Sequence, residues 1–379
     1  MNKTLILYYI YLCLAFFCSC QRGQKEADLL TSPAVCDTLS YATGFKVERF
    51  DDFTYVTLND PWNEGRILHR YILVPKNQSL PDQLPEGTLV RIPIDRVVVY
   101  TSVHASILEE LGEESRIIGV CEPQYLTSER IKSLVADGTI ANVGEAVSPN
   151  IEKIVDIGTE VLLASPFENI GYGAAEKLGL PIIEGADYME TTALSRAEWI
   201  KFYGLLVCKE ALADSLFNST EKNYEELKQL AATAQSRPTV ITERKYGVSW
   251  SIPGGRSYMA SIFEDAGSKY VFDDNEKKGA TSVSFETVLE RGRNADYWLM
   301  KYASDKPFTY ANLRSEYPPY EYFDSFRNKK IYTCNTIQTP YYDEIMLYPE
   351  FLLADMIRIF HPELKLPDRY SQRYYFPMQ

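Results

Sequence analysis

Strand and helix signals alternate along most of this chain, and this alternation limits the folds that it can adopt. A buried strand pattern at residues 96–100 leads into an amphipathic helix pattern at 103–111 and a second strand pattern at 117–120. The same order recurs over residues 151–183 and resumes at 239–242. Such alternation is typical of βαβ units arranged around a parallel sheet. We therefore expect an α/β protein with mostly parallel central sheets.

A long stretch without helix breakers divides these βαβ segments into two groups. Residues 195–234 contain no proline and only one glycine, Gly204, and apolar side chains recur there at steps of three and four. This pattern predicts one long helix or two nearly continuous helices. We thus expect two α/β lobes, residues 44–194 and 237–379, joined by a long rigid bridging helix at 195–236. Loops at the carboxyl ends of the strands would then surround a ligand cleft between the lobes.

The first lobe begins with a segment of a different character. Residues 44–75 carry short alternating strand patterns on both sides of a turn-forming stretch at 59–65. This arrangement predicts a β-hairpin or meander added to the N-terminal lobe.

The N-terminus has the features of an export signal. Lys3 precedes an apolar run at residues 5–17, which is followed by Ser19 and Cys20. Such a segment is a secretory signal and is too short to span a membrane. Its ending resembles a bacterial lipobox, in which Cys20 becomes the first mature residue and carries the lipids; plain cleavage that leaves a free thiol is the alternative. We expect a periplasmic, lipid-anchored protein with a polar tether at 21–43, and the sequence does not indicate which membrane holds it.

Composition excludes some classes of function. The formal net charge is -13, and the acidic residues are spread along the chain, which argues against nucleic acid as a partner. The later cysteines are too far apart for a structural zinc site, although an oxidising compartment would allow disulfides in any of three complete pairings. The 28 tyrosines suit a ligand cleft, because a phenol combines an apolar face with a polar tip. The four cysteines that follow Cys20 are Cys36, Cys121, Cys208 and Cys334.

The loops that follow the expected strands supply the candidate ligand-binding residues. In the first lobe they are Tyr100, Ser102, His104 and Phe167, and in the second they are Arg244, Trp250, Arg256, Tyr258 and Tyr341. Arginines could neutralise an anionic ligand, aromatic rings could stack on a flat one, and His104 could ligate a metal or donate a hydrogen bond. Solvated charges, core aromatics and a helix-capping histidine would give the same sequence pattern. Backbone amides at Gly254-Gly255 could meet an anionic group, or this pair could simply begin a helix.

The order of several short motifs resembles that of a known family. Leu108-Glu109-Glu110-Leu111-Gly112, Asn150-Ile151-Glu152, Ala266-Gly267 and Ser284-Phe285-Glu286 occur around the long helix. Over residues 95–362 the chain resembles the periplasmic binding proteins of ABC importers for iron complexes and cobalamin. Residues 59–62, 194–202 and 360–364 are similar to a lipoprotein branch common in Bacteroides-like bacteria. The resemblance implies a monomer that captures a metal chelate and delivers it to a membrane permease with its ATPase.

The resemblance also implies where the permease would dock. Members of this family use an acidic residue on each lobe, and Glu152 matches that motif in the first lobe. In the second lobe the acidic position aligns with Ala260, a departure that Glu264 or Asp265, one turn later, could compensate.

The sequence does not indicate an enzyme. It contains no HExxH, GxSxG, GxxxxGK[ST] or strand-linked GxGxxG motif. We expect no cofactor and no metal site of the protein's own, with an extracytoplasmic hydrolase as the alternative from another class. Among ligands, basic residues beside aromatics favour an anionic ferric siderophore. Cobalamin, which would need an aromatic clamp with few charges, comes second, and haem, with an axial Tyr or His, comes third.

Overall fold

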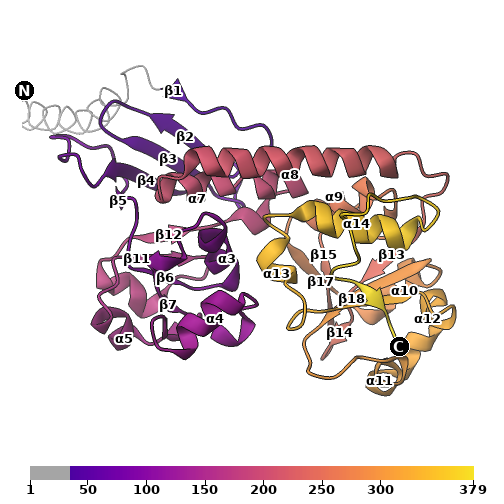
Figure 1. Cartoon of the computed structure of the whole chain (residues 1–379). Coiled ribbons are helices and arrows are strands. Elements are labelled where there is room, and N and C mark those ends of the chain that lie inside the picture. Colours follow the sequence, from indigo (N-terminus) through magenta and orange to yellow (C-terminus); the bar gives the residue numbers. More distant parts are fainter. Residues whose placement is uncertain (1–34) are drawn as a thin grey trace, which may run out of the picture. The chain divides into compact units, whose positions relative to one another are not determined.

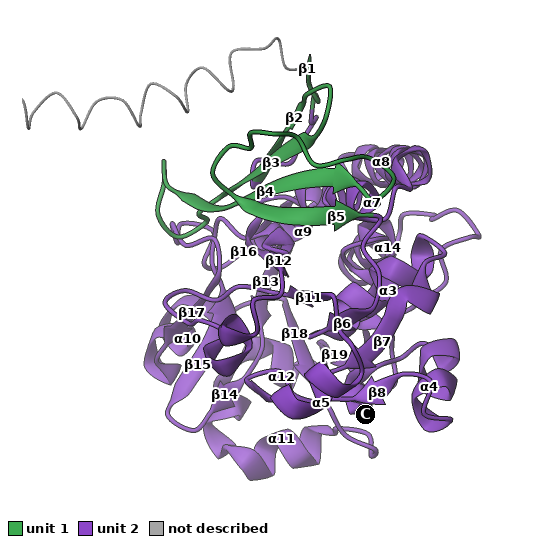
Figure 2. Cartoon of the chain, turned by 90° about the vertical axis from the view of Figure 1, so that its left-hand side faces the viewer, with its two compact units in different colours: residues 1–38, 45–92 green, residues 39–44, 93–379 purple. Residues whose placement is uncertain are grey.

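The computed structural model describes residues 35–379, so the signal, Cys20 and most of the expected tether lie outside the described residues. The chain forms two compact units (Figure 2). Among the described residues, unit 1 contains 35–38 together with Phe45–Ile92, and unit 2 contains Leu39–Gly44 and Pro93–Gln379. The β segment that we expected inside the N-terminal lobe is therefore a unit of its own. No helix among residues 35–379 is long and apolar enough to cross a membrane.

Unit 1 is a single five-stranded sheet in which the strands follow their sequence order. The first four strands are antiparallel neighbours, as a meander predicts, and the fifth pairs parallel to the fourth. Phe53, Tyr55, Ile72 and Val74 are buried together and form a hydrophobic cluster of this unit. The strands are β1 (Val35–Cys36), β2 (Phe45–Arg49), β3 (Thr54–Asn59), β4 (Ile67–Pro75) and β5 (Thr88–Ile92).

The N-terminal lobe of unit 2 is built on the parallel sheet β12-β11-β6-β7-β8 (Figure 1). Its central strands are uniformly apolar, as expected of a sheet that is covered on both faces. Its elements are β6 (Val97–Val99), α3 (Ser102–Glu110), η1 (Glu114–Arg116), β7 (Ile117–Val120), η2 (Pro123–Tyr125), α4 (Glu129–Ala136), β8 (Ala141–Asn142), β9 (Gly144–Glu145), β10 (Ser148–Pro149), α5 (Ile151–Asp156), β11 (Val161–Ala164), η3 (Gly173–Leu178) and β12 (Ile182–Glu184).

The bridge between the lobes consists of three helices rather than one or two. After η4 (Asp187–Met189) come α6 (Ala193–Ala197), α7 (Ile200–Leu206) and the 22-residue α8 (Glu210–Ala231). The chain leaves α7 at Cys208, whose φ of 56° is left-handed and incompatible with a continuous helix. Gly204 lets α7 approach α8 closely, because a Cβ at this position would lie 2.7 Å from the Cβ of Ala213.

The C-terminal lobe repeats the parallel plan with the sheet β16-β13-β18-β19, to which β20 adds an antiparallel edge. A second small sheet, β14-β15-β17, was not expected from the sequence. The elements are β13 (Thr239–Thr242), β14 (Lys245–Tyr246), β15 (Ser249–Pro253), α9 (Tyr258–Asp265), β16 (Lys269–Tyr270), β17 (Ala280–Val283), α10 (Phe285–Gly292), β18 (Tyr297–Tyr302), α11 (Tyr310–Glu316), η5 (Pro318–Tyr322), α12 (Asp324–Arg327), β19 (Ile331–Asn335), α13 (Tyr341–Glu344), α14 (Pro349–Phe360) and β20 (Phe376–Pro377).

Residues 39–44, which we call the strap, leave unit 1 and bind to the bridge through two buried glutamates. Glu198 accepts hydrogen bonds from the backbone N–H groups of residues 40, 41 and 42 at 2.8–2.9 Å. Glu190 accepts from the N–H groups of residues 43 and 44 and from Trp199 Nε1. The polar tether expected over 21–43 is thus corrected at its end, where β1 and the strap are ordered parts of the fold.

The four described cysteines are unpaired. Cys36 and Cys208 are exposed, whereas Cys121 and Cys334 are buried in the two lobes. Burial raises the pKa of the Cys121 and Cys334 thiols, to about 12 in each case. Of the three complete pairings that the sequence allowed, the described structure contains none.

Candidate ligand-binding site

In unit 2, the carboxyl ends of the strands in the two lobes face each other. Thr127, which follows β7, donates from its N–H to Asp343 Oδ2 in α13 at 3.1 Å, and α13 follows β19. Helix α13 also packs against α3, which begins directly after β6. Loops at the carboxyl edge of one sheet therefore touch loops at the carboxyl edge of the other. We call these two sets of loops the facing edges; ligands of α/β proteins commonly bind in such a place.

Large apolar side chains are exposed at the facing edges. Val147, Tyr246 and Val248 are each about nine-tenths exposed and stand at the tips of hairpins that follow β8 and β13. Apolar side chains that gather in one exposed region mark interaction sites, whereas singly scattered ones do not. The exposed apolar residues on loops after strands are Tyr125, Val147, Phe167, Ile170, Tyr246, Val248 and Tyr342. Of these, only Phe167 is among the ligand-binding residues that the sequence predicted.

A pair of carboxyl groups also lies at the N-lobe edge. Glu122 follows β7 with a left-handed φ of 49° and shares a side-chain hydrogen bond with Glu145 of β9. Burial and the neighbouring Glu145 carboxyl raise the pKa of Glu122. Sequence reasoning missed this pair, because only the pairing of β9 and β10 brings Glu145 back toward the end of β7. The pair makes this edge unfavourable for an anionic ligand.

The N-lobe candidates divide into buried and accessible residues. His104 is fully buried, and its Nδ1 lies 3.1 Å from Thr101 Oγ1. Burial lowers the pKa of His104 to about 4, so its ring is neutral at pH 7. Tyr100 is also buried and its hydroxyl has no hydrogen-bond partner among the described residues. Ser102 begins α3, and Phe167 is exposed on the loop after β11.

Two of the predicted C-lobe contacts are core residues, which corrects the sequence interpretation. Trp250 has no exposed surface, stacks on Trp298 with ring centroids 5.5 Å apart, and donates from Nε1 to the Thr242 carbonyl. Tyr341 is buried among the rings of Tyr374 and Tyr375. Neither ring has a free face that could stack on a ligand.

The predicted cationic contacts are already paired. Arg244 at the facing edge donates from Nε to Glu316 at 3.0 Å, and its guanidinium lies 4.8 Å from the ring centroid of Phe308. Arg256 donates from Nε to Glu276 at 2.7 Å. Tyr258 is covered by the guanidinium of Arg196, 4.5 Å from its ring centroid.

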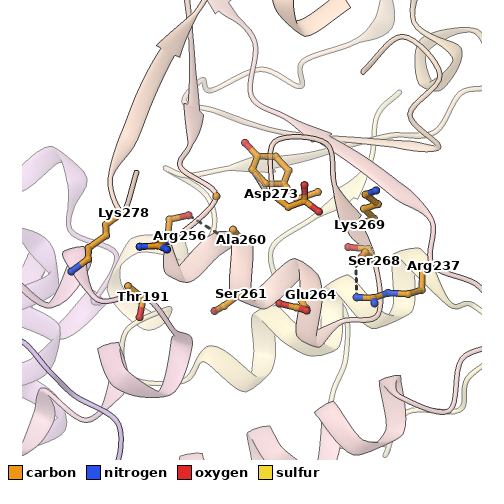
Figure 3. Close-up of a pocket in the computed structure, with 13 residues that line it drawn as sticks. Thr191, Arg237, Arg256, Ala260, Ser261, Glu264, Ser268, Lys269, Asp273 and Lys278 are labelled. Carbon is orange, nitrogen blue, oxygen red and sulfur yellow. Dashed lines mark hydrogen bonds between the residues drawn. The ribbon is translucent and has the colours of Figure 1, made fainter. Parts of the chain in front are cut away.

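Arg256 lines a cavity of about 710 Å³ along α9, and Arg244 is not among its lining residues (Figure 3). The figure shows Arg256 and Lys278 at one end and Arg237 and Lys269 at the other, with Ser261 and Glu264 between them. The Gly254-Gly255 pair beside this cavity has a structural reason: Cβ atoms there would lie 2.0 Å from the Lys277 carbonyl oxygen and 2.5 Å from that of Asn275. The two glycines are needed for close backbone packing.

The two lobes carry matching glutamates at the starts of equivalent helices. Glu152 is the second residue of α5, which leads into β11, and β11 pairs with the first strand of its lobe, β6. Glu286 is the second residue of α10, which leads into β18, and β18 pairs with the corresponding first strand, β13. Both glutamates are exposed, whereas Ala260 is buried. The structural counterpart of Glu152 is therefore Glu286, and neither Ala260 nor Glu264 on α9 occupies that position.

Among residues 35–379, no cluster of three or more His, Cys, Asp or Glu side chains could hold a metal ion. Two parallel-sheet lobes, a helical bridge and facing edges lined with apolar side chains define a two-lobed binding protein. Comparison with known proteins identifies its family: residues 97–337, more than half of the chain, match the periplasmic binding protein family, and the chain belongs to it. It is a substrate-binding protein and not an enzyme.

The relatives and structural neighbours agree with this assignment. Two uncharacterized lipoproteins of Methanocaldococcus jannaschii are 26% and 24% identical to the chain, over 78% and 89% of it and 73% and 86% of their own lengths. A structure from a Fe3+-hydroxamate transport system of Saccharomonospora viridis matches 71% of this chain and 94% of its own, with a TM-score of 0.58 and 18% identity. A periplasmic haem-binding protein of Pseudomonas aeruginosa matches 76% of this chain and all of its own, with a TM-score of 0.57 and 15% identity. At these identities the structural matches establish the fold.

Proposed function

We propose that this protein captures a large, weakly charged metal chelate at the facing edges and delivers it to an ABC importer. A corrinoid such as cobalamin is the first candidate. The observation that carries this choice is the combination of exposed apolar side chains with arginines that are already paired. A neutral chelate with a broad apolar periphery would cover those side chains.

This proposal changes the preference that the sequence suggested. The preference for an anionic ferric siderophore rested on Arg244 and Arg256, but Arg244 is paired with Glu316, and Arg256 is paired with Glu276 and lines the cavity along α9. The Glu122 and Glu145 carboxyls would repel such a ligand. A neutral ferric hydroxamate is the second candidate, supported by the structural neighbour from the Fe3+-hydroxamate transport system of Saccharomonospora viridis. Haem is less favoured, because His104 is fully buried and cannot reach an iron atom from its present position.

A ligand panel tests the choice. Cyanocobalamin, haemin, a neutral ferric hydroxamate and an anionic ferric catecholate would be added to the purified protein and the melting temperature measured. A ligand at 100 times its Kd stabilises a protein by about 2.7 kcal/mol, so the corrinoid should raise the melting temperature by several degrees. A response to the ferric catecholate alone would overturn the proposal.

Paired variants locate the binding surface. Phe167→Ser and Tyr246→Ser remove apolar area from the facing edges and should weaken binding several-fold. Val155→Ser is the matched control, since Val155 is as exposed as Phe167 but lies in α5, which precedes β11 and does not belong to the loops that follow the strands. Equal effects of the three substitutions would place the ligand elsewhere.

We further propose that Glu152 and Glu286 contact the permease, one on each lobe. Their common position at the start of equivalent helices supports this pairing. The double variant E152R/E286R should bind its ligand normally but lose uptake in cells, whereas E264R, a charge reversal on α9, should retain uptake.

Cys20 would hold the protein at a membrane on the extracytoplasmic side, as the names of the lipoprotein relatives suggest. A Cys20→Ser variant should therefore be released into the soluble fraction.

A further inference from the structure

Arg196, in the bridge helix α6, is connected to both lobes. Its Nε donates to Asp187 Oδ2 at 3.0 Å, and both side chains are buried. Asp187 lies in η4, which follows β12, the last strand of the N-terminal lobe. Tyr203 in α7 donates to the other oxygen of the same carboxylate at 3.4 Å. The guanidinium is therefore fixed on its N-lobe side by a buried ion pair.

The face of the same guanidinium packs on the C-terminal lobe. Its Cζ atom lies 4.5 Å from the ring centroid of Tyr258, the first residue of α9. The next residue, Met259, contacts the hydroxyl of Tyr341 in α13 through its sulfur at 3.5 Å. Helix α13 also carries Asp343, whose carboxylate binds Thr127 of the N-terminal lobe. The stacked pair thus lies next to the contact that brings the facing edges together.

The network continues to the loop after β6. The ring of Tyr203 lies 5.8 Å from that of His104, which lies in the first turn of α3. Gly185 allows this approach, because a Cβ there would lie 2.1 Å from the Tyr203 hydroxyl and 2.9 Å from His104 Nε2. One continuous chain of contacts therefore runs from the loop after β6 in the N-terminal lobe to α9 in the C-terminal lobe. Its members are, in order, His104, Tyr203, Asp187, Arg196 and Tyr258.

One donor of this network is unused. Arg196 Nη1 is buried and has no hydrogen-bond partner among the described residues. Buried donors are seldom left in this state.

We propose that Arg196 is a positioning residue that sets the contact between the two lobes, holding the facing edges together by stacking on Tyr258 while it remains anchored to Asp187. Its role in ligand capture rests on the proposed function, but its role in lobe contact does not. Removing the guanidinium should loosen the lobes selectively, without unfolding either one.

Amide hydrogen exchange measures this loosening without any ligand. The Thr127 N–H bonds across the lobes to Asp343, whereas the Leu162 N–H bonds within the N-terminal lobe to the Pro181 carbonyl. In Arg196→Met the Thr127 amide should exchange at least tenfold faster, while the Leu162 amide keeps its rate. Tyr258→Leu should have the same effect, and Tyr258→Phe, which retains the ring, should behave as the unmodified protein.

Arg244→Met is a matched control. Arg244 makes the same two contacts as Arg196, a 3.0 Å Nε–carboxylate bond and a stacked ring at 4.8 Å, but both of its partners lie in the C-terminal lobe. It should leave the Thr127 exchange rate unchanged. An unchanged Thr127 rate in Arg196→Met, or equal acceleration of the Thr127 and Leu162 amides, would overturn the proposal.

Ligand affinity provides a separate test. If cyanocobalamin binds the unmodified protein, Arg196→Met should weaken that binding about tenfold and Arg196→Lys should restore little, because an ammonium lacks the planar face. A failure of cyanocobalamin to bind would contradict the ligand assignment alone, since the exchange experiment contains no ligand. Unchanged affinity together with faster Thr127 exchange would separate lobe contact from capture and overturn the capture role.

Discussion

Two buried glutamates, Glu198 within the bridge and Glu350 beside it, differ in their hydrogen-bond donors. Glu198 accepts from three backbone N–H groups of the strap and from Lys201. Although burial alone would raise its pKa, these donors lower it overall. Glu350, at the start of α14, has Asn223 Nδ2 at 3.4 Å, and its second oxygen has no partner among the described residues. Burial raises the pKa of Glu350 to about 7. The number of donors, and not the depth of burial, therefore decides which carboxyl keeps its charge.

The largest expected effect comes from replacing each glutamate with leucine. Glu198→Leu leaves three partly buried N–H groups without their acceptor, and we expect it to cost about 2–4 kcal/mol of unfolding free energy. Glu350→Leu removes a poorly satisfied carboxyl and should cost less than about 1 kcal/mol or be stabilising. Denaturant unfolding of both variants measures the difference. Equal losses would show that the donors do not distinguish the two sites.

The pH dependence of stability should have opposite signs at the two sites. The pKa of Glu350 is raised, so the folded protein binds its proton more tightly than the unfolded chain. Its contribution to stability is therefore present below pH 4.5 and falls by about 2–3 kcal/mol as the pH rises to 7. The lowered pKa of Glu198 gives a contribution that is present above pH 4.5 and lost in acid. Unfolding measured from about pH 3 to pH 8 should lose the slope above pH 4.5 in Glu350→Gln and the slope below pH 4.5 in Glu198→Gln.

A smaller effect tests whether the strap must fit closely around its carboxylates. A Cβ on Gly44 would lie 2.6 Å from a ring carbon of Trp199 and 2.9 Å from Glu190 Oε1. Gly44→Ala should therefore cost about 1–3 kcal/mol through overpacking. Gly279→Ala is the control, because its Cβ would make only an ordinary contact with Met189 at 3.4 Å. A cost for Gly279→Ala as large as that for Gly44→Ala would remove the packing explanation.

The smallest expected effect concerns a distant charge near Glu350. Arg369 forms an exposed ion pair with Glu226 and lowers the pKa of Glu350 only slightly. Arg369→Ala should change the unfolding free energy by about 0.5 kcal/mol or less. A larger loss at pH 8 than at pH 5 would indicate that this charge replaces the missing donors, contrary to our interpretation.

Much of the fold follows from the sequence because its signals are local. The expected strands at 117–120 and 239–242 coincide with β7 and β13, and the expected helix at 103–111 corresponds to α3. The predicted long helix is present as α8, but the predicted bridge did not include a break before it. Nothing in the sequence showed that Cys208 would adopt a left-handed conformation and separate α7 from α8. The small sheet β14-β15-β17 was missed because β17 joins it from 27 or more residues away along the chain.

The site was harder to predict, because ligand contact depends on which side of an element faces water. Trp250 alternates with exposed neighbours in β15, and its burial beside Ile252 on the inner face could have been inferred from that period. Tyr341 and Tyr342 are adjacent in sequence, yet only Tyr342 is exposed. Likewise Arg196 and Glu198 are two residues apart, and only the tertiary structure shows that one contacts the lobes and the other the strap.

The strap determines where tension along the N-terminal chain would enter unit 2. Five consecutive backbone amides, from Ser40 to Gly44, are held by Glu198 and Glu190 on the bridge. A pull from the N-terminal side would be shared among these bonds and transmitted to the helices between the lobes, without passing through either parallel sheet.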